Sequence, residues 1–328
     1  MSVIHLDPQN PPALPPIALT LGNFDGVHLG HQAMLHALHQ DAQRLSLQTA
    51  VMIFEPQPRE FFNPDTPPAR LTSLDEKITL LQGLGVDFVL VADFNQAFRL
   101  LSAHEFGGLL QQLNAQFLVI GDDFRFGHDR TGDRAFLQDM GFAVDSLATV
   151  SHDDTRISST AVRQALAQGD LTTAKALLGR DYAITGDVVH GDKIGRTLNF
   201  PTANIALNRT KPALQGIFGA DIFAFKDGQM VSFDALAVNN QTGITGTQPN
   251  SLWGAVNIGT RPSVNGQDYR LEVHLPEFVG DLYGLTLQVM FKHFLHDEKK
   301  YPDLDSLQTA IAQDVNELIQ WRHTFIIK

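Results

Sequence analysis

The first half of the chain alternates short apolar runs with segments of helical periodicity. The apolar runs are Ile17–Leu21, Thr49–Phe54, Phe88–Val91, Phe117–Ile120 and Ala143–Val150. The helical segments cover residues 31–45, 75–84, 104–113 and 159–168. This alternation is typical of a doubly wound α/β domain with a parallel sheet. Ligands of such sheets bind beyond the carboxyl ends of the strands, so we expect a site assembled from the residues that follow several strands.

The second half of the chain has a different pattern, in which Gly, Asn and Pro separate short apolar runs. These runs are Tyr182–Val189, Gly216–Phe225, Ser232–Ala237, Gly254–Ile258, Arg270–Leu275 and Leu285–Phe294. Six such strands predict a closed antiparallel β-barrel, followed by a helix near residues 305–322. We expect a helix over 164–178 to join the halves and the polar segment 238–252 to be an exposed loop. The predicted domains are therefore 1–182 and 183–328.

Composition narrows the chemistry. The chain has 328 residues, no cysteine and a net charge of −12. Disulfides, thiolate metal sites and a cysteine nucleophile are therefore excluded. No apolar run approaches the roughly 18 residues of a membrane span, and basic residues do not cluster as nucleic-acid binding requires. We expect a cytoplasmic protein that acts on small molecules, with neither nucleic acid nor membrane as a partner. The sequence leaves weak homo-oligomerisation open.

One segment carries the strongest chemical signal. It reads Gly22-Asn23-Phe24-Asp25-Gly26-Val27-His28-Leu29-Gly30-His31 and lies between a predicted strand and a predicted helix. The glycines allow a tight turn, and His28 and His31 are spaced to point the same way from the first helical turn. The unpaired N–H groups of that turn also attract anions. The segment predicts a nucleotide-phosphate site, in preference to two ordinary surface histidines.

A second segment, residues 156–163, places hydroxyls and a guanidinium at another helix start. Ser159 and Thr160 can cap the helix or bind an anion, and Arg163 lies one turn further on. A capped helix with a nearby ion pair is the structural alternative. Two phosphate-suited helix starts in one α/β domain favour the nucleotide interpretation.

Several further motifs together carry a family resemblance. They are residues 21–31, 54–62, 70–77 (Arg-Leu-Thr-Ser-Leu-Asp-Glu-Lys), 121–127 with 132–133, 157–163, 191–204, 256–262, 271–275 (Leu-Glu-Val-His-Leu) and 280–284. In this order they resemble the bacterial bifunctional riboflavin kinase/FAD synthetases over nearly the whole chain. The resemblance implies a Rossmann-like nucleotidyltransferase domain that adenylylates FMN to FAD. It also implies a riboflavin-kinase-like barrel that phosphorylates riboflavin to FMN, with ATP as substrate and Mg²⁺ as cofactor.

For the N-terminal domain, the resemblance implies that Gly22, Asn23, Phe24 and Asp25 help to hold the nucleotide. It places Asp123, Phe124 and Arg125 on the flavin side. Phe124 or Phe126 could stack on the isoalloxazine, and core packing is the alternative for either ring. Adenylyl transfer needs no general base, because the FMN phosphate is already an anionic nucleophile. The donors His28, His31, Ser159, Thr160 and Arg163 would therefore suffice.

In the C-terminal domain, the riboflavin hydroxyl is a weak nucleophile, and a carboxylate could accept its proton. Glu272 is the candidate base, because alternation places it on the face opposite Leu271 and Val273. An exposed glutamate on the barrel wall is the alternative. The oxygens of Thr202 and Asn204 suit Mg²⁺. Residues 191–196 predict a glycine flap over the polyphosphate, in which Gly191, Lys193 and Gly195 take part. A plain glycine hairpin is the alternative.

The resemblance also places Asn257 and Arg261 among the substrate-binding residues. Three features depart from it: Gln57 replaces a usual histidine, Asn199 replaces a common glycine, and the segment 238–252 is long. We expect these departures to change rates and affinities more than the reaction. Two rival interpretations are a class I aminoacyl-tRNA synthetase-like enzyme, which the acidic charge disfavours, and a single-activity adenylyltransferase whose barrel senses flavin.

Overall fold

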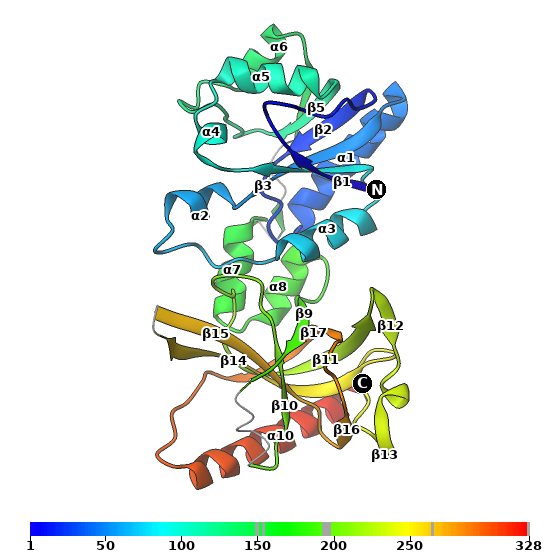
Figure 1. Cartoon of the computed structure of the whole chain (residues 1–328), viewed down its shortest axis with the longest axis vertical. Helices are drawn as coiled ribbons and strands as arrows, with labels where there is room; N and C mark the ends of the chain where they lie inside the picture. The colour runs from blue at the N-terminus through cyan, green and yellow to red at the C-terminus, as the bar shows by residue number, and fades with distance from the viewer. Residues whose placement is uncertain (148–150, 153–154, 192–197, 264–265, 327–328) are drawn as a thin grey trace. The chain divides into compact units, whose positions relative to one another are not determined.

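The computed structural model describes residues 1–147, 151–152, 155–191, 198–263 and 266–326. The chain divides into two compact units, Met1–Ala161 and Val162–Lys328. The labelled elements of both are drawn in Figure 1. This division lies before the boundary at 182/183 that the change of pattern predicts. In the described part of the chain, no helix has both the length and the apolar character needed to cross a membrane.

The first unit is built on a six-stranded sheet. Its order is β1(Ser2–Leu6), β4(Phe88–Asp93), β3(Gln48–Glu55), β2(Ile17–Leu21), β5(Ala115–Gly121) and β6(Ala143–Leu147). All neighbouring pairs are parallel, which confirms the predicted doubly wound sheet. The apolar pattern does not indicate β1, a short edge strand. Strand order reverses between β2 and β5, and such a switch point is where α/β sheets bind ligands.

Helices cover both faces of this sheet because successive residues of each strand point to opposite sides. On one face, Ala18 and its neighbours pack against α1(Leu29–Leu45) and α3(Leu74–Gly83). On the other face, Leu19 and its neighbours pack against α5(Ala103–Gln112). Three shorter helices, α2(Pro58–Phe62), α4(Gln96–Arg99) and α6(Arg134–Asp139), lie in the connections. The two apolar layers fix the strand ends on which the site depends.

The segment after the sheet differs from the prediction. A small hairpin of β7(Ser151–His152) and β8(Thr155–Arg156) precedes α7(Ser159–Ala167). The predicted helix 164–178 is wrong, because the chain breaks it before α8(Leu171–Leu178). Gly169 has a φ of 70°, which helices do not allow, and the Asp170 carboxylate caps α8 by accepting from the Thr173 N–H at 2.9 Å.

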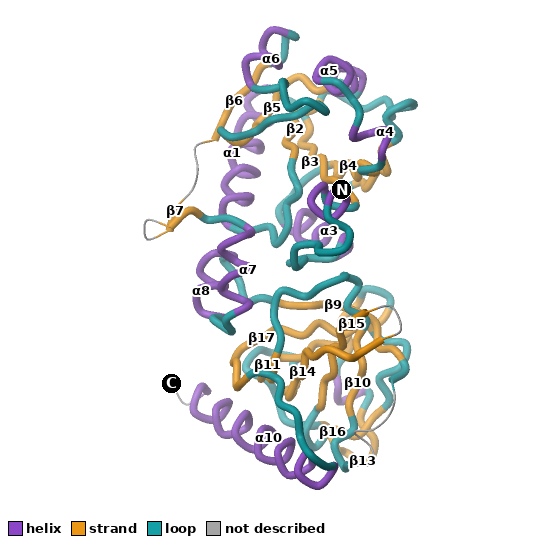
Figure 2. Tube along the Cα trace, turned by 90° about the vertical axis from the view of Figure 1, so that its left-hand side faces the viewer, coloured by secondary structure: helices purple, strands orange, loops and turns teal. Residues whose placement is uncertain are grey.

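The second unit contains the predicted closed six-stranded antiparallel barrel. The strands follow the order β11(Gly216–Lys226), β14(Leu252–Ser263), β15(Gly266–His274), β10(Thr202–Ile205), β9(Ala183–Val189) and β17(Thr286–His296). Pairing of β17 with β11 closes it, and β12(Gln229–Val231) extends β11 at the side. Figure 2 shows these strands in orange. The predicted strand 232–237 is wrong. Its centre is a 3₁₀ turn, η1(Phe233–Ala235), and the sixth strand is β10.

The polar segment 238–252 is not wholly the exposed loop that we expected. Its first part continues β13(Ala237–Thr242), which pairs with β16(Phe278–Gly280). Further along, Thr247 donates from its N–H and its hydroxyl to the buried Asp221 carboxylate, both at 2.5 Å. The insertion is therefore anchored to the barrel wall.

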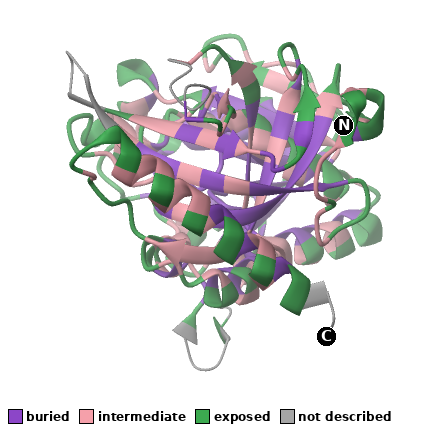
Figure 3. Cartoon of the chain, turned by 90° about the horizontal axis from the view of Figure 1, so that it is seen from below, coloured by how far each residue is buried: buried purple, intermediate pink, exposed green. Residues whose placement is uncertain are grey.

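The predicted C-terminal helix is α10(Leu304–Ile326), which packs on the barrel. Trp321 of this helix stacks on Trp253 of β14, with ring centroids 5.6 Å apart. Figure 3 shows that burial concentrates on the strands, while exposed positions recur along the helices.

Candidate functional site

The loop after β2 has an unusual backbone. Phe24 and Val27 have φ values of 48° and 39°, and Gly26 between them has 79°. Side chains other than glycine rarely adopt this region, and such strain concentrates at functional sites. Here the conformation is held because Phe24 and Val27 are themselves buried in the apolar layer beneath α1. The loop is therefore a preformed structure.

Asp25 anchors the loop from within. Only 1% of Asp25 is exposed, and its carboxylate accepts from the N–H groups of Leu71 and Thr72 at 3.1–3.2 Å. The Thr72 hydroxyl also donates to it, and itself accepts from the Gly26 N–H at 3.1 Å. These bonds join the loop to the segment that leads into α3. The nucleotide contact that the resemblance implies for Asp25 stays a prediction.

His28 and His31 meet at the start of α1. His28 is the N-cap residue, and its Nδ1 accepts from the His31 N–H at 3.4 Å. The two rings stack with centroids 3.7 Å apart, and the centroid of the Phe24 ring lies 4.7 Å from that of His31. A Cβ atom on Gly30 would come within 3.2 Å of the His28 ring. A larger residue at position 30 would therefore press on the His28 ring.

The second predicted helix start lies against the same loop. The Ser159 hydroxyl donates to the Asp25 carbonyl at 2.9 Å, across 134 residues of chain. Ser158 caps α7 by accepting from the Ala161 N–H at 3.2 Å. Thr160 is exposed beside Ser159, and Arg163 follows one turn later on α7. Two segments far apart in sequence therefore converge beyond the carboxyl ends of the sheet.

A buried ionic cluster, which the sequence analysis missed, lies near the end of β3. Arg70 donates to Glu60 and to Glu55, the latter at 2.7 Å. Burial acts to lower the pKa of Arg70, but these two carboxylates outweigh it and raise that pKa. Lys77 of α3 is fully buried, and burial lowers its pKa despite the opposing charges of Asp25 and Glu55. Among the described residues, its ammonium nitrogen has no hydrogen-bond partner.

A cavity of about 350 Å³ opens beside these elements in the first unit. Aromatic rings form most of its lining, and cationic groups are placed among them. The lining includes Phe54, Phe62, Phe94, Phe98, Phe124, Phe126, Arg99, Arg125, His128 and Arg130. Phe126 belongs to the buried core, whereas Phe124 is only partly buried and stacks on it with centroids 5.7 Å apart. Asp123, next to Phe124, pairs with Arg156 at 2.9 Å. The cavity suits a flat aromatic ligand with an anionic group.

In the barrel, strand register brings three predicted residues into one row. Asn204 of β10 and Asn257 of β14 are the partners of Glu272 on either side of β15. Leu271 and Val273, the neighbours of Glu272 on β15, are both buried. This agrees with the predicted alternation, which places Glu272 on the opposite face of the strand. Two residues along, Thr202 is the partner of His274.

The predicted flap begins against this row. A Cβ atom on Gly191 would come within 2.2 Å of the Asn204 side-chain amide, so a larger residue there would have to displace that side chain. Asn199 has a φ of 63°, as expected of an asparagine that replaces glycine. Lys193 and Gly195 lie outside the described residues. Arg261 belongs to β14 opposite Asp268, and its side chain also lies outside the described part.

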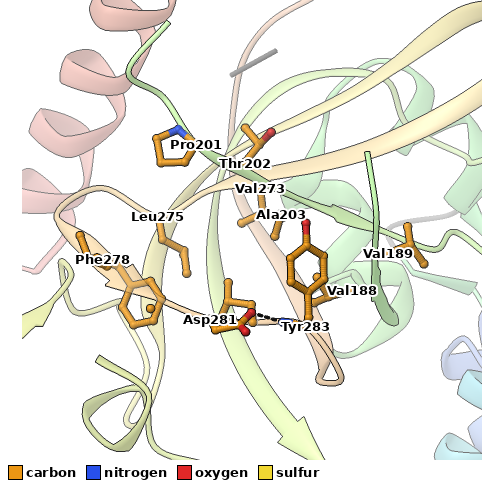
Figure 4. Close-up of a pocket in the computed structure, with 13 residues that line it drawn as sticks. Val188, Val189, Pro201, Thr202, Ala203, Val273, Leu275, Phe278, Asp281 and Tyr283 are labelled. Atoms are coloured by element: carbon orange, nitrogen blue, oxygen red, sulfur yellow. Dashed lines mark hydrogen bonds between the residues drawn. The ribbon is translucent and has the colours of Figure 1, made fainter. Parts of the chain in front are cut away.

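The barrel carries a cavity of about 260 Å³, to which β10 contributes Thr202 and Ala203 and β15 contributes Val273. Figure 4 shows its lining, which is mainly apolar and includes Val188, Leu275 and Tyr283. Thr202 adds a hydroxyl, and Asp281 accepts from the Tyr283 N–H at 3.0 Å. Within the described ranges, no group of three or more His, Asp or Glu side chains could hold a metal ion. The hydroxyl of Thr202 and the amide oxygen of Asn204 are hard donors, which fit Mg²⁺ when phosphate oxygens complete its shell.

Comparison with known proteins agrees with this two-site arrangement. The family model for FAD synthetase matches residues 10–161, and that for riboflavin kinase matches residues 178–322. A curated bifunctional riboflavin kinase/FMN adenylyltransferase from Escherichia coli (strain K12) is 43% identical over 302 residues, 90% of each chain. The corresponding protein from Pseudomonas fluorescens is 45% identical over 304 residues, again 90% of each.

A solved structure from Streptococcus pneumoniae, described as a macrolide-efflux protein, is also similar. It has a TM-score of 0.76 and 26% identity, and the match covers 97% of this chain and 99% of that one. The fold and the two sites define a two-domain nucleotide-dependent transferase. The chain belongs to the bifunctional riboflavin kinase/FMN adenylyltransferase family.

Proposed function

We propose that the chain makes FAD from riboflavin in two ATP-dependent steps, at the two sites described above. Residues 183–328 phosphorylate riboflavin to FMN, and residues 1–182 transfer the adenylyl group of ATP to FMN with release of pyrophosphate. The hydrogen bond between Ser159 and Asp25 carries the adenylylation proposal, because it joins the two phosphate-suited helix starts. The barrel row of Asn204, Glu272 and Asn257 carries the kinase proposal.

In the adenylylation site, His28 and His31 donate to the α-phosphate, where charge builds up as the FMN phosphate attacks. Fixed donors at that position stabilise the transition state and need no reorganisation. The motif predicts further donors in Ser159, Thr160 and Arg163, and the Ser159 hydroxyl would have to exchange its bond to the Asp25 carbonyl for one to phosphate. Gly22, Asn23 and Phe24 shape the loop around the nucleotide, while Asp25 holds that loop in place. The strained, buried backbone keeps the donors in position before ATP arrives.

FMN occupies the aromatic cavity of the first unit. Phe124 stacks on the isoalloxazine, because it is the partly exposed ring of the stacked pair. Arg125 meets the FMN phosphate, and Asp123 orients this segment through Arg156. The volume of about 350 Å³ lies within the range of small-molecule pockets.

In the kinase site, Glu272 accepts the proton of the riboflavin 5′-hydroxyl as the oxygen attacks the γ-phosphate. Asn257 holds the substrate next to Glu272, with which it pairs across the strands. The apolar cavity beside Thr202 and Tyr283 receives the nucleobase of ATP. Gly191, Lys193, Gly195 and Arg261 retain the substrate-binding roles that the resemblance gives them.

Thr202 and Asn204 would hold Mg²⁺, which neutralises phosphate charge when it is bound. Thr202 and Asn204 lie on β10, which pairs with β15. The proposed metal ligands and the proposed base Glu272 therefore lie on neighbouring strands. We also propose that both reactions take place in the cytoplasm and that any self-association is weak.

One experiment separates this proposal from its rivals. Purified protein is mixed with riboflavin, ATP and Mg²⁺, and the flavins are resolved by chromatography over time. We expect FMN to appear first and FAD to follow. Conversion of added FMN to FAD without phosphorylation of riboflavin would favour an adenylyltransferase with a sensor barrel. Neither product, together with amino-acid-dependent pyrophosphate exchange, would favour the synthetase-like interpretation.

A further inference from the structure

His274 is a polar residue of the barrel to which neither the motifs nor the proposed function gives a role. It ends β15, two residues after Glu272, and its strand partners are Thr202 of β10 and Ala255 of β14. Its Nδ1 lies 2.9 Å from the carbonyl oxygen of Pro201. Its ring also meets Phe200 edge to face, with centroids 5.4 Å apart. His274 therefore contacts the two residues that lead into β10.

The chemistry of the contact fixes the form of the ring. A carbonyl oxygen can only accept, so Nδ1 carries the hydrogen and donates it to Pro201. In the neutral ring, Nε2 is then the acceptor. Burial lowers the pKa of His274, against the smaller opposing effect of the Pro201 carbonyl. The bond to Pro201 therefore needs only a hydrogen on Nδ1, which the neutral Nδ1–H tautomer and the charged ring both carry.

Pro201 makes that bond important for β10. Proline has no N–H, so its backbone can be tied only through its carbonyl. The next residue, Thr202, begins a strand of four residues, of which only Asn204 and Ile205 also pair with β9. A strand this short has few bonds of its own to fix where it starts.

We propose that His274 is a positioning residue for the kinase reaction. Its Nδ1–H fixes the Pro201 carbonyl and thereby sets Thr202 and Asn204 relative to Glu272. The inference rests on the proposed roles of Thr202, Asn204 and Glu272. It predicts that loss of the Nδ1–H donor weakens the binding of the Mg²⁺–ATP complex more than the binding of riboflavin.

Two near-isosteric variants separate the donor from mere bulk. The amide nitrogen of asparagine branches from Cγ, as Nδ1 does, whereas that of glutamine lies one atom further out, near Nε2. His274→Asn should therefore keep the bond to Pro201, and His274→Gln should lose it. A net hydrogen bond of this kind corresponds to about a tenfold effect. We expect His274→Gln to raise the KM for MgATP about tenfold with the KM for riboflavin unchanged, and His274→Asn to stay within about threefold of the parent.

Binding gives an independent readout. Calorimetric titration with MgADP should show the same order of affinities, parent and His274→Asn above His274→Gln. His323→Gln, at an exposed position of α10, is the matched control. All variants should convert added FMN to FAD at the parent rate and melt in one cooperative transition, which shows that the chain is folded.

Three results would overturn the inference while leaving the proposed function intact. They are equal losses in His274→Asn and His274→Gln, no loss in either, and a loss confined to riboflavin binding. Failure of the parent protein to phosphorylate riboflavin would instead overturn the proposed function itself.

Discussion

The imidazole rings of His28 and His31 stack at an interplanar angle of 16° in the turn that opens α1. The His28 ring caps the helix by accepting from the backbone N–H of His31, a residue of the first turn, so this bond ties the ring of one histidine to the backbone of the other. In the proposed adenylylation, this stacked pair supplies two nitrogen donors to the α-phosphate, where charge develops.

Replacing either ring should therefore stop adenylylation. We expect His28→Ala and His31→Ala to reduce FAD formation from FMN by about 10²–10³, by analogy with the loss of an oxyanion donor, while riboflavin phosphorylation persists. Rates of FMN and FAD formation, measured separately, test this. His36→Ala, at an exposed position on the same helix, is the control. Parent-like FAD formation in either active-site variant would disprove the assignment of the loop.

Glu272 provides the matching test in the barrel. Glu272→Gln keeps the size and hydrogen-bonding capacity of the side chain but cannot accept a proton. FMN formation should fall by roughly 10²–10⁴, with MgADP binding retained and added FMN still converted to FAD. An unchanged kinase rate would leave Glu272 as part of the barrel wall. Loss of both activities would indicate a folding defect, which circular dichroism can detect.

The stacked rings of Phe124 and Phe126 should respond differently to truncation. Phe124→Ala is expected to raise the KM for FMN in adenylylation about tenfold, because aromatic stacking contributes about 0.5–1.5 kcal/mol beyond area burial. Phe126→Ala should instead lower the melting temperature of the protein, because Phe126 lies in the core. Steady-state kinetics and thermal melts of the two variants measure this contrast. If neither variant raises the KM for FMN, the flavin does not bind in this cavity.

The barrel should work alone only if α8 stays attached. Asp181 accepts from Lys292 of β17 at 2.6 Å and pairs with Lys175 of α8 at 3.0 Å. We expect a fragment of residues 171–328 to fold and phosphorylate riboflavin. A fragment of residues 183–328 should be unstable, because it loses the apolar face of α8 and leaves Lys292 buried with only Asp221, 3.6 Å away. Circular dichroism and kinase assays on both fragments check this. Equal stability of the two would show that α8 adds nothing to the barrel.

The same carboxylate predicts an acid sensitivity. Burial acts to raise the pKa of Asp181, but Lys292 and Lys175 outweigh it, so the pKa is lowered in the folded protein. A lowered folded pKa means that Asp181 stabilises the fold above its unfolded pKa and loses this contribution as pH falls through the folded value. Melting temperatures of the parent and Asp181→Asn should therefore differ at pH 7, and the difference should shrink as the pH falls below the unfolded pKa of about 3.9. A constant difference across that range would contradict the assignment.

The pattern of apolar residues along the chain predicted the strands and helices that bury an apolar face. It did not predict features that depend on contacts with residues far away in the sequence. The five predicted strands of the first unit were found, whereas β1 is a short edge strand that only its pairing with β4 defines. Asp25 looked like a ligand contact. Its anchoring role depends on Leu71 and Thr72, which lie 46 and 47 residues away. Gly169 and Asp170 do carry a readable signal, a glycine followed by a helix-capping residue, and it locates the break between α7 and α8.

The barrel error has the same origin. The segment Thr202–Ile205 follows a proline and includes the polar residues Thr202 and Asn204. No apolar run therefore indicates a strand there. Its β conformation comes from the register with β15, where Glu272 faces Asn204. The site residues could thus be found by motif and resemblance, but their common row could not, because a row is a property of strand pairing.

The short strand β10 also determines how the barrel can open. On one side it pairs with β15 over four residues, but on the other only two residue pairs join it to β9. A barrel opens locally where two neighbouring strands share the fewest hydrogen bonds. We therefore expect the amide hydrogens between β9 and β10 to exchange faster than those of the other strand pairs. A ligand that contacts both Val188 of β9 and Thr202 of β10 would hold these two strands together and oppose their opening. Occupancy of the cavity would then be recorded as slowed exchange in β10, a strand that reaches the core only at Ile205.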